Sequence, residues 1–207
     1  MQVGQSRTIL WHSLCPSICV LKHVRPHQGD FTKKQQGFSL IELLIVVAII
    51  LIIAAIAIPN LLRSKIAANE SSAVGSVRTI GTAEVTYSSS WGSGYSVDLK
   101  SLGGAPPCIN AVATAACLID PLLSVAPYTK SGYAFDAAGT LLVGTVYNGF
   151  EVNATPTTVQ TTGVRAFCDD QTGVLKFVSP GAGPIGVVAP SCQNVATVAG
   201  VSGPVGN

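Results

Sequence analysis

Glu42 needs an explanation first, because it is the single charged residue in the apolar run from Phe38 to Ile58. A carboxylate inside an apolar helix is expensive in lipid, so it needs a partner or a function. If the chain were cut between Gly37 and Phe38, a new α-amino group would lie four residues before Glu42. In a packed array of such helices, the carboxylate of one copy would neutralise the amine of its neighbour. A Glu tolerated at the interface of an isolated membrane anchor is the alternative interpretation.

Other residue types that could do chemistry are poorly placed for it. All three histidines precede Gly37, which leaves no Ser-His or Cys-His catalyst after it. The adjacent Asp169 and Asp170 in DDQTG lack the spaced oxygen ligands of a calcium loop. The segments GGAP and GAGPIG lack the lysine and following helix of a phosphate loop. We therefore expect no enzyme, no bound metal and no cofactor.

The cysteines indicate an oxidising compartment. Four of them, namely Cys108, Cys117, Cys168 and Cys192, follow the apolar run, and such an even set suggests two disulfides. We favour pairing of neighbours in the sequence, Cys108 with Cys117 and Cys168 with Cys192, because most of the expected sheet lies between the two pairs. The other pairings stay open.

Two minor features carry little weight. Cys15 and Cys19 lie before the apolar run and lack the partners of a metal site. Asn153, in the triplet Asn-Ala-Thr, matches a glycan acceptor, but so short a motif often occurs by chance.

The apolar run itself is long enough to span a membrane. As a helix, residues 38–58 would extend about 30 Å, the thickness of a bilayer core. A cleaved secretory peptide would have a shorter core and a small-x-small cleavage site, which is missing here, so the run is expected to be retained. Lys33 and Lys34 directly before it place the leader in the cytoplasm and the remainder outside.

The charge of the exported part disfavours nucleic acid as a partner. The chain has twelve basic and ten acidic residues, of which five basic and one acidic precede Phe38. Seven basic and nine acidic residues remain, a net charge of −2 without a cluster of Lys and Arg.

The residues after Pro59 predict a second, amphipathic half of the same helix. In residues 59–91, apolar side chains recur at helical spacing, at Ile66, Ala73, Val77, Ile80 and Ala83 or Tyr87. Pro59 predicts a kink or local melting, because proline removes a backbone hydrogen bond. We expect the helix to end between Tyr87 and Trp91, where SSSWGSG begins a loop.

The remainder predicts a small antiparallel sheet, and with the long helix an α+β fold. Residues 92–130 have turn signals and no sustained period, which favours irregular structure with short helical turns. Strand-like segments follow, joined at DDQTG by a hairpin connection: SGYAFDA, LLVGTVYNGFEVNA, VRAFCDD and GVLKFVS. We expect about three or four strands across the helix. The globular domain would cover residues 92–178, and residues 179–207, rich in Gly and Pro, would form an extended or disordered tail.

The segment KKQQGFSLIELLIVVAIILIIAAIAIPN resembles the class III signal of type IV pilins and type II secretion pseudopilins. The matching features are basic residues before Gly37, Gly37 itself, Phe38, Glu42 as the fifth mature residue, and Pro59 closing the run. The leader of residues 1–37 is longer than is usual in this family. Either it is unusually long, or translation starts nearer FTKKQQGF.

The resemblance implies cleavage after Gly37 and N-methylation of Phe38 by a membrane prepilin peptidase. It further implies a single-pass inner-membrane precursor with a cytoplasmic N-terminus, which an assembly machinery builds into an extracellular homopolymer. Phe38, Glu42 and Pro59 would serve subunit assembly. The leading hypothesis is a structural subunit of a type IV pilus. Two alternatives are a pseudopilin of type II secretion and a minor pilin that binds a surface or DNA.

Overall fold

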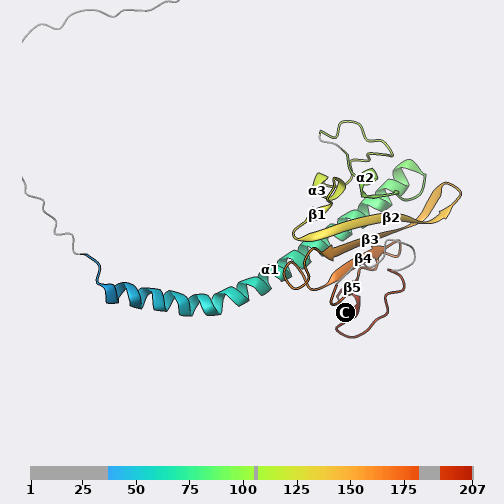
Figure 1. Cartoon of the computed structure of the whole chain (residues 1–207). Coiled ribbons are helices and arrows are strands. Elements are labelled where there is room, and N and C mark those ends of the chain that lie inside the picture. The colour runs from blue at the N-terminus through green and yellow to red at the C-terminus, as the bar shows by residue number, and fades with distance from the viewer. Residues whose placement is uncertain (1–36, 105–106, 182–191, 207) are drawn as a thin grey trace, which may run out of the picture. The chain divides into compact units, whose positions relative to one another are not determined.

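The computed structural model describes residues 37–104, 107–181 and 192–206. The chain divides into two compact units, one ending at Leu43 and the other beginning at Leu44. The described elements are the helices α1 (Leu40–Trp91), α2 (Leu99–Leu102) and α3 (Pro121–Ser124), and the strands β1 (Thr129–Lys130), β2 (Tyr133–Val143), β3 (Val146–Pro156), β4 (Ala166–Asp170), β5 (Lys176–Val178) and β6 (Ser202–Pro204). Figure 1 shows the second half of α1 lying along the sheet. The α+β class is confirmed.

The second half of α1 carries the predicted apolar stripe. Ala73, Val77, Ile80, Ala83 and Tyr87 are all buried, at the spacing that places them on one face of a helix. The helix ends at Trp91, within the predicted window.

Pro59 lies inside α1, and the residues on both sides of it remain helical. The predicted local melting is therefore absent from the structure. A proline removes one hydrogen bond, whereas the turns before and after it keep theirs.

The sheet is an antiparallel meander in the order β1-β2-β3-β4-β5-β6, and thus has more strands than expected. The two extra strands, β1 and β6, are short edge strands. The predicted tail contributes β6, which pairs with β5 through Phe177 and Gly203. Within residues 179–207, which we expected to be an extended or disordered tail, β6 is thus an extended strand paired with the sheet, and residues 182–191 lie outside the described part.

A second correction concerns the segment LLVGTVYNGFEVNA, which we expected to be one strand. It contains a hairpin, in which β2 ends at Val143 and β3 begins at its partner Val146. Gly144 makes the turn with φ of 65°, a left-handed conformation that favours glycine. The turn could not be recognised in the sequence, because apolar residues lie on both sides of it.

Both faces of the sheet's centre are buried. Phe150, Val152 and Ala154 of β3 belong to the same core as the buried stripe of α1. Glu151 and Asn153 alternate with them and so lie on the opposite face, yet they are buried too. The segment that starts at Cys192 contacts that face, because its backbone amide donates to the Glu151 carboxylate.

The predicted irregular region contains the short helices α2 and α3. Asp98 caps α2 by accepting from the Ser101 amide at 2.8 Å, and Asp120 caps α3 by accepting from the Leu122 amide at 2.9 Å. The predicted connection DDQTG does join β4 to β5, with Gly173 at φ of 71°.

Candidate functional site

The predicted cleavage point is sterically open in the structure. Gly37, Phe38 and Ser39 precede the first residue of α1. No atom lies within 4 Å of the position that a side chain on Gly37 would take, and Phe38 is 82% exposed. The described residues therefore leave the peptide bond after Gly37 accessible to an enzyme.

Glu42 occupies the first turn of α1. A carboxylate there interacts favourably with the positive end of the helix dipole. Ser39 and Glu42 also have the spacing of a capping box, in which Glu or Gln accepts from the amide of the residue before the helix. The position in the first turn thus allows Glu42 to stabilise the start of the helix, in addition to the predicted contact between copies.

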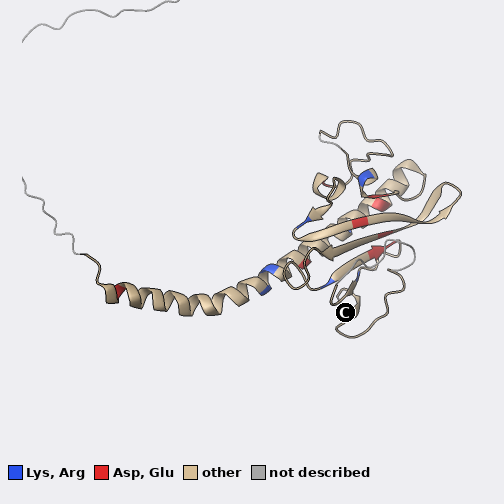
Figure 2. Cartoon of the chain, in the orientation of Figure 1, with Lys and Arg blue, Asp and Glu red and all other residues tan. Residues whose placement is uncertain are grey.

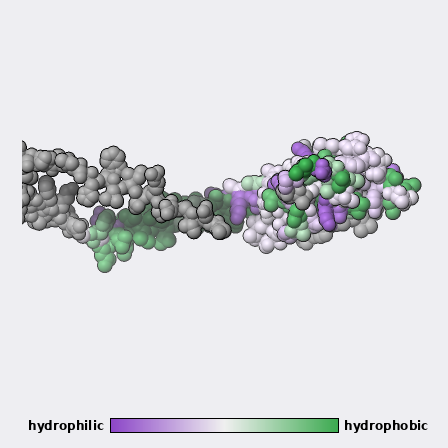
Figure 3. All heavy atoms as spheres, turned by 90° about the horizontal axis from the view of Figure 1, so that it is seen from above, coloured by the Kyte–Doolittle hydropathy of each residue, from purple (hydrophilic) through white to green (hydrophobic). Residues whose placement is uncertain are grey.

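The first half of α1 has no charged residue between Glu42 and Arg63. Its large apolar side chains are exposed in the structure, as far as Ile58, which directly precedes Pro59. Figure 2 shows this stretch without charge, and Figure 3 shows hydrophobic side chains along it. Within the described residues, α1 is the one helix long and apolar enough to cross a membrane. So large an unburied apolar surface needs lipid or other protein around it.

Glu70 holds the second half of α1 to the sheet. One of its carboxylate oxygens accepts from the backbone amides of Val164 and Arg165 at 2.9 and 3.1 Å. The other forms an ion pair of 2.7 Å with the Arg165 guanidinium. The Glu70 carboxylate thus makes one charge-assisted ion pair and two hydrogen bonds to backbone amides. These contacts fix α1 to the residues directly before β4.

Glu84 makes a second tie, between α1 and the loop that follows it. Its side chain is fully buried and accepts from the Ser96 amide at 2.9 Å and from the Ser96 hydroxyl at 2.6 Å. Burial raises the pKa of Glu84 from its ordinary value of 4.5 to about 7, although the bonds from Ser96 oppose this rise. Nothing in the sequence pattern predicted this buried acid.

Asp169 and Asp170 are both buried, although they lie at the end of β4 where the predicted connection DDQTG begins. Asp169 lies on the helix side, where its Oδ2 would be 2.9 Å from a side chain placed on Gly81. Burial raises the pKa of Asp169 from 3.8 to about 6. Asp170 lies on the opposite side and accepts from the Thr172 amide at 2.7 Å.

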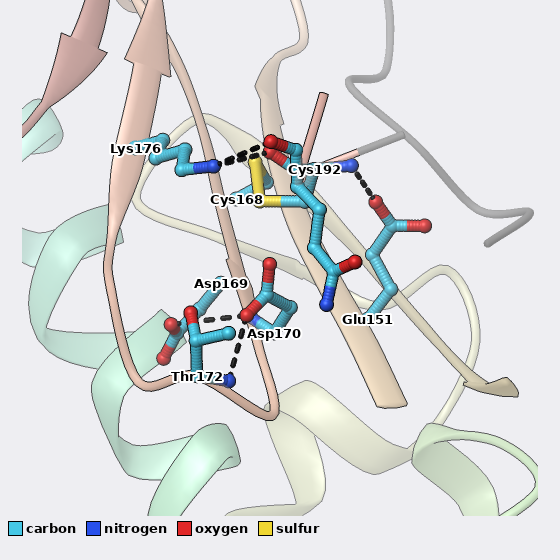
Figure 4. Close-up of a disulfide and its surroundings, with 8 residues drawn as sticks. Glu151, Cys168, Asp169, Asp170, Thr172, Lys176 and Cys192 are labelled. Carbon is cyan, nitrogen blue, oxygen red and sulfur yellow. Dashed lines mark hydrogen bonds between the residues drawn. A yellow bond between two sulfur atoms is a disulfide. The ribbon is translucent and has the colours of Figure 1, made fainter. Parts of the chain in front are cut away.

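The structure pairs the cysteines as neighbours. Cys108 bonds to Cys117, and Cys168 of β4 bonds to Cys192. Figure 4 shows the second disulfide with Lys176, whose amino group donates to the backbone carbonyls of Cys192 and Gln193 at 3.0 and 2.8 Å. The disulfide and this amino group together fix the segment at Cys192 to the sheet.

The predicted glycan acceptor Asn153 is buried. It is 2% exposed in the central strand β3, which makes it unsuitable as a glycan acceptor in the folded chain. The predicted leader lies outside the described residues, except for Gly37. This includes the three histidines, Lys33, Lys34, Cys15 and Cys19. The described residues contain no group of three or more His, Cys, Asp and Glu side chains arranged around a metal.

Comparisons with known proteins agree with this geometry. Residues 32–58 match the prokaryotic N-terminal methylation motif. The chain is 41% identical over 76 residues to the type IV major pilin protein PilA of Myxococcus xanthus strain DK1622. That similarity covers 37% of this chain and 34% of PilA, so the chain matches about a third of that relative's length. No solved structure matches the chain.

The fold is pilin-like. It has one long helix with an apolar first half and an amphipathic second half, and the second half packs on an antiparallel sheet. The methylation motif and the similarity to PilA support the type IV pilin family for this chain.

Proposed function

We propose that this chain is a structural subunit of a type IV pilus. The observation that carries the proposal is the exposed, uncharged stretch of α1 behind Glu42, at a segment that matches the methylation motif. This surface is unstable in water and becomes stable when it is buried, first in lipid and then against other copies of the same helix.

Processing prepares the subunit for this role. A membrane prepilin peptidase cuts after Gly37 and methylates the new amino group of Phe38. The leader of residues 1–37 stays in the cytoplasm, whereas α1 from Phe38 to Ile58 holds the precursor in the inner membrane. An assembly machinery then extracts the subunit into an extracellular homopolymer, with the globular domain of residues 92–178 outside.

Glu42 sets the register between copies. Its carboxylate pairs with the Phe38 amine of a neighbouring copy, and this pairing makes both charges tolerable in an apolar core. Support comes from the position of Glu42 in the first turn of α1, close to the new N-terminus. Pro59 lies where the uncharged stretch ends and is the point at which the helix could unwind when the fibre is stretched.

Replacing Glu42 tests the proposal, provided that the charge is separated from the size and polarity of the side chain. Glu42→Gln keeps the size and a polar oxygen and loses the charge, whereas Glu42→Ala loses all three. We expect both variants to reduce surface fibres at least about tenfold, since a buried amine without its partner costs about 3 kcal/mol or more. Fibres in the sheared fraction are measured by immunoblot against the total subunit.

Asp120→Asn is the matched control, because Asp120 is an exposed acid and Asn retains the capping oxygen. It should leave fibre yield unchanged. Normal fibres from Glu42→Gln would refute the charge pairing, and a cell surface without any fibre containing this chain would refute the pilus function itself.

A further inference from the structure

The turn between β2 and β3 exposes three consecutive large apolar side chains. Leu141, Leu142 and Val143 are 52%, 57% and 68% exposed. Elsewhere in the described part of the chain after Leu62, exposed large apolar residues are not adjacent in the sequence. Such single residues are normal on a protein surface, whereas a contiguous apolar patch marks an interaction site. We call residues 141–146 the hairpin tip.

The hairpin tip lacks the features that normally protect exposed strands. Residues 137–150 contain no charged side chain, although charges, above all lysines, usually protect strands that face water. Leu141 also has φ of 53°, a left-handed conformation that strains a residue with a Cβ atom. The chain accepts both the exposure and the strain at this turn, which favours a role in binding.

The hairpin tip lies at the C-terminal end of α1, as Figure 1 shows. The amide of Tyr95, which follows this helix, donates to the carbonyl of Tyr147 at the base of the tip, at 2.9 Å. Between Ile58 and Trp91, α1 advances about 50 Å at 1.5 Å per residue. A bilayer around the first half of α1 therefore does not cover the hairpin tip of the same chain.

The first half of α1 needs a cover that its own domain does not supply. Residues 43–53 are apolar at every position, so all sides of the helix are apolar there. In a bundle of such helices, other copies of α1 cover the inward sides and leave the outward side open. The domain of the same chain buries α1 only from Glu70 onwards. The outward side must therefore be covered by the domain of another copy.

The direction of assembly determines which part of that domain is available. If the chain is a pilus subunit, as proposed above, every copy leaves the membrane with its domain first and the first half of α1 last. Neighbours along the fibre then contact each other through different surfaces. The trailing end of an earlier copy, its first half of α1, is followed by the leading end of a later copy, which carries the hairpin tip.

We propose that the hairpin tip packs on the first half of α1 in a neighbouring copy. Both surfaces are apolar and exposed in the single chain, and neither brings a charge to the contact when it uses the stretch behind Glu42. Each surface removes from water what the other leaves exposed, which stabilises the fibre along its axis.

Photocrosslinking in sheared fibres tests this contact. The full chain carries p-benzoylphenylalanine in place of Leu142, and the fibres are irradiated and digested with trypsin. We expect a dimer whose crosslink joins the hairpin tip to the peptide that ends at Arg63. The control carries the same group in place of Leu122, which lies in α3 and is 58% exposed. It should not label that peptide.

Substitutions test whether the contact supports assembly. Leu142→Asp brings a charge into the contact, and Leu142→Thr removes apolar surface but suits a strand. We expect Leu142→Asp to lower the fibre yield at least about tenfold at unchanged total subunit, the factor expected for one lost apolar side-chain contact. Leu142→Thr should cause a smaller loss, and the matched control Leu122→Asp should assemble like the original chain.

The outcomes separate this contact from the pilus function on which it rests. No dimer in fibres, a crosslink to any other part of the chain, or equal fibre yields from Leu142→Asp and Leu122→Asp would overturn the contact alone. Normal fibres of Leu142→Asp that no longer attach to an apolar surface would overturn it in favour of adhesion. An original chain that forms no fibre would refute the pilus function, and the contact with it.

Discussion

Two glycines in α1 differ in their surroundings, which yields a prediction at the scale of single residues. A methyl group on Gly81 would lie 2.9 Å from Asp169 Oδ2, whereas one on Gly75 would meet nothing within 4 Å. We expect Gly75→Ala to stabilise the fold by about 0.5–1 kcal/mol, because alanine is the better helix former. We expect Gly81→Ala to destabilise it by about 1–3 kcal/mol through overpacking. Urea unfolding of the two matched variants measures the difference, and equal effects would contradict the packing of α1 on β4.

Glu84 predicts a pH dependence of stability. Burial raises the pKa of Glu84 from 4.5 to about 7 in the folded chain. Between these two pH values, Glu84 is protonated in the folded state and ionised in the unfolded state. This contribution is present below about pH 4.5 and is lost as the pH rises through about 7, with a total of about 3 kcal/mol. The raised pKa of Asp169 acts in the same direction at slightly lower pH.

Glu84→Gln should therefore flatten the pH profile of unfolding free energy between about pH 5 and 8. The substituted amide oxygen still accepts from Ser96, which limits other effects. Glu42→Gln, which changes an exposed acid of the same helix, should leave the slope as it is. An unchanged slope in Glu84→Gln would mean that Glu84 is ionised in the folded chain.

At the scale of elements, the disulfides differ in what they join. Cys108–Cys117 closes a loop with a sequence separation of 9, and Cys168–Cys192 one of 24 that ties the final segment to β4. Loop-closure entropy gives about 2.5 and about 3.5 kcal/mol, respectively. We expect Cys192→Ser to destabilise more than Cys117→Ser in chemical unfolding, and also to expose residues after Val178 to protease. The opposite order would show that the final segment is held by other contacts.

The sequence predicted the elements that have a long hydrophobic period or that end at a recognisable turn sequence. The stripe from Ala73 to Tyr87 repeats over several turns, and DDQTG marks the connection between β4 and β5. It did not predict the turn at Gly144, because the residues around it are apolar on both sides. The strands β1 and β6 are too short to show a period.

The buried acids were the larger omission. Glu84, Glu151 and Asp170 look like surface residues in a sequence, since acids are rarely buried without partners. Their burial depends on contacts between distant segments, such as Glu84 with Ser96 and Glu151 with Cys192. By contrast, the first half of α1 could be interpreted from sequence alone, because its chemistry depends on local composition and on Glu42.

At the scale of the whole molecule, one chain combines two surfaces with different requirements. The first half of α1 exposes apolar side chains and one acid, and it is stable only in lipid or against other protein. The domain built on the second half has its own core and disulfides. A subunit of this kind can leave the membrane without unfolding its domain, provided that other copies replace the lipid around α1.

The central claim is that a cut after Gly37 creates the end of α1 that assembles. Mass spectrometry of subunits taken from sheared surface fibres tests it most directly. The account predicts a chain that begins at Phe38 and carries one methyl group on its amine. Fibre subunits that retain residues before Phe38, or that begin at a different residue, would contradict it.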